Sequence, residues 1–119
     1  MLRIIRELLE FKPVGKNTDI SGALKYLSNV MKKKAIVFLL SDFMADEYQH
    51  TLKIVAGKHD MTGIRVYDKM EESIPNLGLV QMLDDESGEY INVDTGSKAV
   101  RRSYSKYYQD RLNFFHQSF

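Results

Sequence analysis

An unbroken apolar run, ended abruptly by Ser41 and Asp42, is the feature that most constrains the fold of this chain. Six consecutive apolar residues, Ala35 to Leu40, are typical of a β-strand that is covered on both faces, as in a parallel sheet. In open α/β sheets, binding sites form in the crevice outside the carboxyl ends of the strands. We therefore expect strand 35–41 to lie inside a parallel sheet, with Ser41 and Asp42 placed where a ligand or metal would bind.

The size and charge of the chain restrict its function. Its 119 residues make one domain, able to bury roughly two-thirds of the surface that the unfolded chain exposes. The net charge of +1 gives no general attraction to nucleic acid or to an anionic membrane. The sequence has no cysteine, which excludes disulfides and thiolate zinc sites and is compatible with a reducing compartment. No apolar run approaches the roughly 20 residues that span a bilayer, so we expect a cytoplasmic chain without membrane contact.

Helices and strands alternate through the first half of the sequence. Apolar residues recur at helical spacing on both sides of strand 35–41. The predicted order is a helix over 2–11, a loop over 12–19, a helix over 20–31 capped by Thr18 or Asp19, strand 35–41, a helix over 46–58 and a strand over 61–67. This alternation, with short joins, favours right-handed crossovers and a parallel sheet flanked by helices.

The second half of the sequence has a different pattern. Residues 77–83 and 89–93 resemble two strands joined by a turn whose Gly88 suits a left-handed position, which predicts a hairpin at one edge of the sheet. From Ser97 onward, apolar residues place an aromatic stripe on a final helix; these are Val100, Tyr104, Tyr107, Tyr108, Leu112 and Phe115. The predicted fold is α/β: a partial doubly wound, mostly parallel sheet with an edge hairpin, flanked by helices.

Thr18 and Asp42 are the residues most suited to bind a metal. They stand in two loops that such a fold brings to the same rim of the sheet. A hydroxyl and a carboxylate are hard oxygen donors, and Mg²⁺ needs only one or two protein carboxylates because it keeps several waters. The same residues also suit purely structural roles, Thr18 as a helix cap and Asp42 as a turn residue. Spacing alone leaves both interpretations open.

Several short segments, taken together and in order, resemble a known family. They are Gly15-Lys16-Asn17-Thr18-Asp19-Ile20, Ala23-Leu24-Lys25-Tyr26-Leu27, Phe38-Leu39-Leu40-Ser41-Asp42-Phe43, Lys58-His59-Asp60, Arg65-Val66-Tyr67-Asp68, Ile74-Pro75-Asn76-Leu77-Gly78 and Asp85-Glu86-Ser87-Gly88-Glu89. In this order the chain resembles the carboxyl-terminal half of a von Willebrand factor A-like domain. More narrowly, it is similar to an uncharacterised bacterial family often encoded beside MoxR-type AAA ATPases. The resemblance spans nearly the whole chain.

The resemblance implies a metal-ion-dependent adhesion site built on three loops. The first loop of such a site carries an Asp-x-Ser-x-Ser motif, the second a Thr and the third an Asp. Thr18 takes the second place and Asp42 the third, with Ser41 adjacent. No Asp-x-Ser-x-Ser motif occurs in this sequence, so the resemblance implies a truncated domain without the first loop. Two ligands are too few to hold Mg²⁺ tightly, and we expect weak or absent metal binding by this chain alone.

Truncation would also change the surroundings of strand 35–41. Without its neighbour, the strand becomes a long apolar edge with unpaired backbone groups, and such edges seek partners. We expect self-association through this edge, or its cover by a rearranged helix of the same chain.

Two functions remain from this reasoning. The first is a noncatalytic interaction module whose intact form grips an acidic side chain of a partner through Mg²⁺; the partner that the resemblance implies is a MoxR-type AAA ATPase. The alternative is a metal-dependent hydrolase or phosphotransferase of doubly wound fold that uses Asp42. That reaction needs a general base and a second carboxylate near Asp42, which the sequence does not offer convincingly. Ser41 lacks the glycine-flanked turn and the histidine of a nucleophile.

Other constellations have simpler structural explanations. His59-Asp60 resembles the pair of HD phosphohydrolases but lacks an upstream histidine at the right spacing. The acidic cluster over 84–89 does not follow the ligand order of an EF-hand. Lys32-Lys33-Lys34 sits at a helix end, where cations favour the helix dipole, so we expect no nucleic-acid binding.

Overall fold

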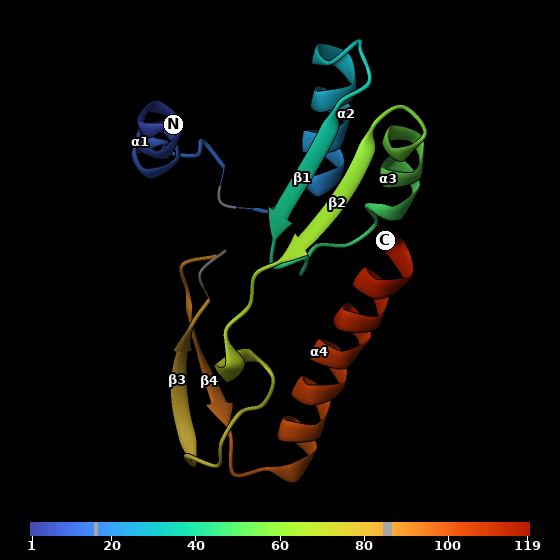
Figure 1. Cartoon of the computed structure of the whole chain (residues 1–119). Helices are drawn as coiled ribbons and strands as arrows, with labels where there is room; N and C mark the ends of the chain where they lie inside the picture. Colours follow the sequence, from blue (N-terminus) through green and yellow to red (C-terminus); the bar gives the residue numbers. More distant parts are fainter. Residues whose placement is uncertain (16, 85–86) are drawn as a thin grey trace.

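The computed structural model describes residues 1–15, 17–84 and 87–119 and has a mixed α/β architecture (Figure 1). Its elements are α1 (Leu2–Glu10), α2 (Ile20–Val30), β1 (Ile36–Ser41), α3 (Gln49–Ala56), β2 (Asp60–Arg65), the 3-10 helix η1 (Lys69–Glu71), β3 (Leu79–Leu83), β4 (Tyr90–Asp94) and α4 (Lys98–Ser118). The predicted order of helices and strands is confirmed. The helix expected from residue 46 begins three residues later, at Gln49, because residues 42–48 form a loop in which Phe43 and Glu47 have positive φ.

The strands form two separate sheets in the described part of the chain. β1 and β2 pair in parallel, from Ile36 opposite Asp60 to Ser41 opposite Arg65. β3 and β4 pair antiparallel in a sheet of their own. The expectation that the hairpin extends the parallel sheet is therefore wrong: the segment over 66–78 carries the chain away from β2 before β3 begins (Figure 1). The parallel pairing and the α/β class agree with the sequence.

The main core lies on one face of the parallel sheet, under α2 and α3. Its fully buried members are Ile20, Leu24, Phe43, Tyr48, Leu52 and Val55, and partly buried Phe114 and Phe115 of α4 pack against them. Burial of each large apolar side chain stabilises the fold by roughly 1.5–3 kcal/mol. The core thus joins both helices of the sheet to the last turns of α4.

The opposite face of the parallel sheet is open. Ile36, Phe38 and Leu40 are 71%, 61% and 63% exposed, and Ile64 of β2 is 41% exposed. The expectation of a strand covered on both faces is wrong for the described chain, because α2 and α3 both pack on the side of Leu39. The radius of gyration is 17.3 Å, against about 13.5 Å for a compact chain of this length.

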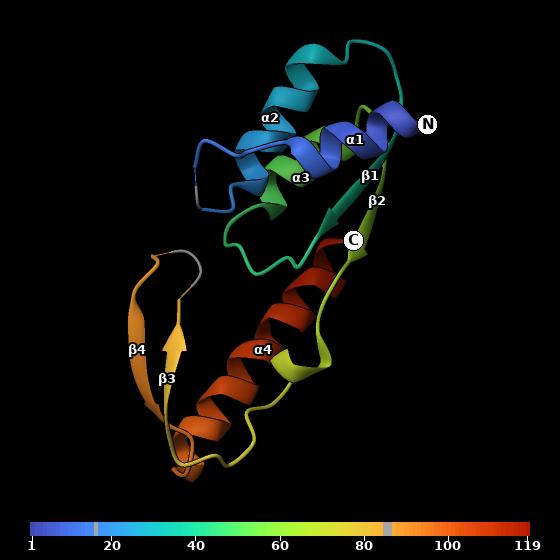
Figure 2. The same ribbon diagram turned by 90° about the vertical axis from the view of Figure 1, so that its left-hand side faces the viewer.

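Helix α1 buries none of its residues. Its charged and its apolar side chains lie on different faces of the helix. The large apolar ones, among them Leu8 and Leu9, remain exposed. In Figure 1, α1 lies apart from the other elements, and in Figure 2 it crosses in front of α3. Uncovered apolar side chains therefore lie on α1 and on one face of the parallel sheet.

Helix α4 joins the two sheets. The hydroxyl of Ser97 accepts a hydrogen bond from the N–H of Val100 and begins the helix, which runs for 21 residues. Near its start, Arg101 donates to the carbonyl oxygen of Thr95, beside β4, over 2.6 Å. Near its end, Phe115 packs against Phe43 with ring centroids 4.6 Å apart. Among the described residues, no helix combines the length and apolar character needed to cross a bilayer.

Asp19, not Thr18, caps α2, and this gives a direct test of the fold. Oδ1 of Asp19 accepts a hydrogen bond from the N–H of Gly22 over 2.7 Å. Asp19→Ala is expected to lower the free energy of unfolding by about 1 kcal/mol, and Thr18→Ala to change it by less than about 0.5 kcal/mol. Urea titrations of the two variants would show this difference, and equal losses would contradict the assignment of the cap.

Candidate functional site

The candidate site is the rim at the carboxyl end of β1, where the strand passes into the loop over 42–48. The side chain of Asp42 is exposed. Its Oδ1 accepts hydrogen bonds from the N–H of Met44 over 3.1 Å and from the hydroxyl of Ser41 over 3.3 Å. The Ser41 hydroxyl in turn accepts from the N–H of Phe43 over 3.1 Å. This local turn fixes the carboxylate at the end of the strand, as short polar side chains do in Asx turns.

Phe43 anchors this loop to the core. It is fully buried although its φ is 56°, a left-handed value that is uncommon for a residue with a bulky side chain. Its ring contacts those of Tyr48, Phe115 and Phe119, with centroids 5.7, 4.6 and 5.5 Å away. Burial raises the pKa of the Tyr48 hydroxyl. The backbone adopts a strained conformation here, so that Phe43 points inward while its neighbour Asp42 points outward.

Arg65, the last residue of β2, holds the loop after β1 in place through its guanidinium group. Its Nε donates to the backbone carbonyl of Asp42 over 3.1 Å, and its Nη1 donates to the hydroxyl of Tyr108 over 3.0 Å. The guanidinium also lies 4.9 and 4.8 Å from the ring centroids of Tyr67 and Tyr108. Sequence reasoning assigned Arg65 no role. Its position could have indicated a role, because Arg65 ends the strand that pairs with β1 and lies directly opposite Ser41.

Thr18 lies two residues before the start of α2, in the segment that leads into this helix. It lines an open hollow of about 400 Å³ together with Asn17, Met44, Ala45, Asp46 and Tyr107. The structure therefore brings Thr18 to the loop that follows Asp42, although Asp42 itself does not line this hollow. The Thr18 hydroxyl forms no hydrogen bond with another described residue.

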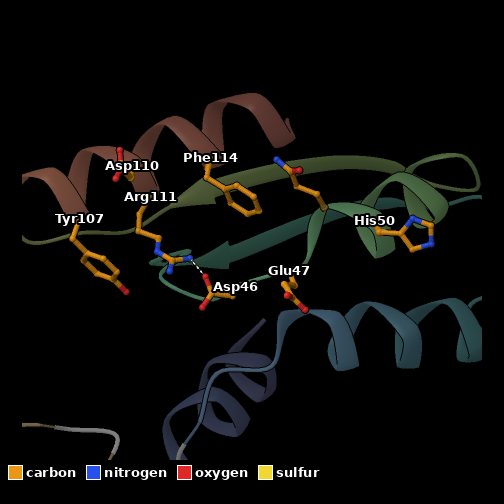
Figure 3. Close-up of a pocket in the computed structure, with 8 residues that line it drawn as sticks. Asp46, Glu47, His50, Tyr107, Asp110, Arg111 and Phe114 are labelled. Atoms are coloured by element: carbon orange, nitrogen blue, oxygen red, sulfur yellow. Dashed lines mark hydrogen bonds and ion pairs between the residues drawn. The ribbon is translucent and has the colours of Figure 1, made fainter.

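Asp46, the next acid along the loop, is engaged by Arg111 of α4. Nη1 of Arg111 bonds to Oδ1 of Asp46 and also donates to the carbonyl oxygen of Ala45 over 3.3 Å. The hydrogen bond that Arg111 donates to the Asp46 carboxylate raises the pKa of the guanidinium. This pair borders a larger open hollow of about 700 Å³ between the loop and α4, which His50 also lines (Figure 3). Asp46 is thus neutralised by Arg111.

The oxygen ligands at the rim are of the type that Mg²⁺ prefers, but there are too few of them. They are the hydroxyls of Thr18 and Ser41 and the carboxylate of Asp42, all of them hard oxygens. Within the described ranges, no three His, Asp or Glu side chains are grouped so that they could hold a metal. A tightly bound Mg²⁺ at this rim would need further ligands.

The other constellations do not form sites in the described residues. His59 is buried between α3 and β2, whereas the adjacent Asp60 is exposed and forms an ion pair with Lys34 over 3.0 Å. His59 precedes β2, and its buried ring and the exposed Asp60 carboxylate, which is paired with Lys34, do not form one site. Of the acidic cluster over 84–89, Asp85 and Glu86 lie outside the described residues.

Comparisons with known proteins point to a family without an assigned activity. A family model described as "Protein of unknown function DUF58" matches residues 1–113. The "uncharacterized protein MAV169" of Mycobacterium avium is 29% identical over 77 residues, which cover 64% of this chain and 46% of that protein. The "uncharacterized protein Rv1480" of Mycobacterium tuberculosis is 28% identical over 89 residues, 74% of this chain and 28% of that protein. The chain spans less than half the length of these relatives. No solved structure matches it significantly.

Proposed function

Because the chain belongs to the DUF58 family, we propose that it is a noncatalytic interaction module that binds a protein partner through a Mg²⁺-dependent site at the carboxyl end of β1. We further propose that the chain has the fold of the carboxyl-terminal half of a von Willebrand factor A-like domain. The remaining Mg²⁺ ligands then come from a loop outside this sequence. The proposed partner is a MoxR-type AAA ATPase, as the family resemblance implies.

One observation supports this proposal above the others: the segment with Thr18 and the loop after Asp42 line one hollow at the carboxyl end of β1. The Asp42 carboxylate faces solvent, and its orientation is set by the N–H of Met44. No described residue donates to its Oδ2, so this oxygen is free for a cation. Asp46 already pairs with Arg111, which leaves Asp42 as the unpaired acid at this end of the loop.

The chemistry of these residues suits binding better than turnover. Mg²⁺ held by one carboxylate and hydroxyls retains open positions, which waters or a carboxylate of the partner can fill. A hydrolase would also need a general base within hydrogen-bond reach of the attacking water. The imidazole of His50, in the first turn of α3, lines the larger hollow beside Asp46 and Arg111 (Figure 3) and is not among the residues that line the hollow of Thr18.

The decisive experiment measures partner binding by the natural protein that carries this chain. Binding to the MoxR-type ATPase of the same genome is titrated with Mg²⁺ and with EDTA, in the unaltered protein, in Asp42→Ala and in Asp110→Ala. We expect Asp42→Ala and EDTA each to weaken binding about tenfold or more, a change of about 1.4 kcal/mol. Asp110→Ala removes another exposed carboxylate and should leave binding unchanged.

Two results would refute the proposal. One is binding that resists both EDTA and Asp42→Ala. The other is hydrolysis of a phosphate ester by the unaltered protein that Asp42→Ala abolishes, because this would favour the hydrolase or phosphotransferase instead.

A further inference from the structure

Another hollow lies at the end of α4 that is remote from the rim. It has a volume of about 480 Å³ and is formed by the segment after η1 and the first turns of α4, which run side by side (Figures 1 and 2). Its lining residues are Ser73, Ile74, Lys98, Arg101, Arg102 and Ser105. We call it the basic hollow, because three of these side chains are positively charged and none is negatively charged.

The spacing of the α4 residues places them on one face of the helix. Lys98, Arg101, Arg102 and Ser105 are separated by three, four or seven positions from the first of them, and such positions share a helix face. Ser73 reaches the same hollow from the segment after η1. The fold therefore gathers two guanidinium groups, one ammonium group and two hydroxyls around one space.

Most of these groups are available for a ligand. Arg101 uses its Nη1 to donate to the carbonyl oxygen of Thr95 over 2.6 Å. The side chains of the other four polar residues of the hollow form no hydrogen bond or ion pair with any described residue. Lys98 and Arg102 are exposed to solvent. The hollow thus carries positive charges and hydroxyl donors that its own described side chains do not use.

The acidic residues that precede Ser73 do not neutralise this charge from within the hollow. Neither Glu71 nor Glu72 is among the residues that line it. Glu71 lies near Tyr104, on the neighbouring face of α4, where burial and then the charge of Glu71 raise the pKa of the Tyr104 hydroxyl. The hollow therefore keeps its positive character although acidic residues lie close by in sequence.

The position of these cations in α4 is the reverse of the usual one. The amino end of a helix carries a partial positive charge, so acidic side chains stabilise the first turn and basic side chains destabilise it. Lys98 is the first residue of α4, and the first turn contains no acidic residue. An anion in the basic hollow would offset both this repulsion and the repulsion among the three cations.

We propose that the basic hollow binds a phosphate group, either as inorganic phosphate or on a small phosphorylated molecule. Guanidinium groups bind phosphate oxygens in pairs, and an ammonium group adds a point charge. A phosphate monoester carries nearly two negative charges at pH 7 and three acceptor oxygens. It can therefore engage more of the five donor groups than a single carboxylate, which has one charge and two oxygens. Ile74 supplies an apolar wall for the organic part of such a molecule.

The test is a titration of the unaltered chain, followed by amide NMR spectra at constant ionic strength without Mg²⁺. Inorganic phosphate and glycerol 3-phosphate are the probes, and succinate is the control because two carboxylates give it a similar charge. We expect saturable shifts at Ser73, Ile74 and the start of α4, with a dissociation constant of about 1 mM or below, since charge-assisted hydrogen bonds contribute at least this much together. Succinate should bind at least about tenfold more weakly.

The two phosphate probes distinguish the source of the ligand. Tighter binding of glycerol 3-phosphate than of inorganic phosphate would identify a small phosphorylated molecule as the ligand. Equal or weaker binding of glycerol 3-phosphate would identify inorganic phosphate.

Substitutions in α4 test the role of the cations. Lys98→Ala and Arg102→Ala should each raise the dissociation constant for phosphate about tenfold. Arg102→Lys should recover part of the loss, because it keeps the charge without the planar fork. Lys106→Ala removes an exposed cation of the same helix that does not line the hollow, and it should have no effect. Asp42→Ala should also bind phosphate as the unaltered chain does, which separates this site from the proposed Mg²⁺ site.

Three outcomes would overturn the proposal. The first is the absence of saturation at about 10 mM phosphate, ten times the expected constant. The second is equal affinity for succinate, which would mean that the hollow responds to charge alone. The third is a loss of affinity in Lys106→Ala as large as in Arg102→Ala, which would mean that phosphate interacts with the basic surface of α4 in general.

Discussion

Phe43→Ala is expected to lower the free energy of unfolding by about 3–5 kcal/mol, which is the usual cost of removing a buried phenylalanine ring. Phe43 is fully buried and its ring contacts three other aromatic rings, two of them on or after the last turns of α4. The total free energy of unfolding of a domain of this kind is about 5–15 kcal/mol, so the variant would lose much of its stability. Urea denaturation followed by circular dichroism measures the loss.

The positive φ of Phe43 provides a matched control. Glycine normally costs about 0.5–1 kcal/mol relative to alanine in regular structure, but it adopts left-handed conformations freely. Phe43→Gly is therefore expected to be at least as stable as Phe43→Ala, because it removes the same ring and relieves the backbone at φ 56°. A clearly less stable glycine variant, or a loss below about 1 kcal/mol in both, would contradict the anchoring role that we assign to this residue.

Arg65→Ala is expected to lower the free energy of unfolding by about 2–3 kcal/mol. The substitution removes hydrogen bonds from a charged group to the carbonyl of Asp42 and to the hydroxyl of Tyr108, together with contacts to two aromatic rings. The hydroxyl of the buried Tyr108 also loses its donor. Denaturation midpoints at constant pH would measure this change.

Two controls define what Arg65 contributes. Arg65→Lys keeps the charge but not the planar fork that reaches two acceptors at once, so we expect it to recover only part of the stability. Arg102→Ala removes an exposed arginine of α4 and should cost less than about 0.5 kcal/mol. If Arg65→Ala were as mild as Arg102→Ala, the rim would not depend on this side chain.

The local elements of the fold could be predicted because each depends on nearby residues. The period of apolar residues located α2 and β1, and Ser97 begins α4 where a hydroxyl precedes the aromatic stripe. The cap of α2 was left between Thr18 and Asp19, and the structure selects Asp19 because its carboxylate reaches the N–H of Gly22. Spacing could not make that choice, since both side chains can cap a helix.

The arrangement of these elements could not be predicted in the same way. An apolar run shows that a strand is suited to burial on both faces. It does not show which elements cover each face, and Phe38 is exposed because no described element covers its side of the sheet. The hairpin was expected beside β2, and only the course of residues 66–78 shows that it forms its own sheet. Arg65 escaped notice because its partners, Asp42 and Tyr108, lie 23 and 43 residues away in sequence.

Helix α4 gives the chain a mechanical property. It is a continuous rod of 21 residues, about 31 Å long at 1.5 Å per residue, and it is fixed at both ends: Arg101 holds Thr95 beside the hairpin, and Phe115 is wedged against Phe43 under the rim. The helix therefore connects the hairpin sheet to the loop of Asp42 through one contact at each end. We expect a change in the position of the hairpin to reach this loop along α4, without any direct contact between the two sheets.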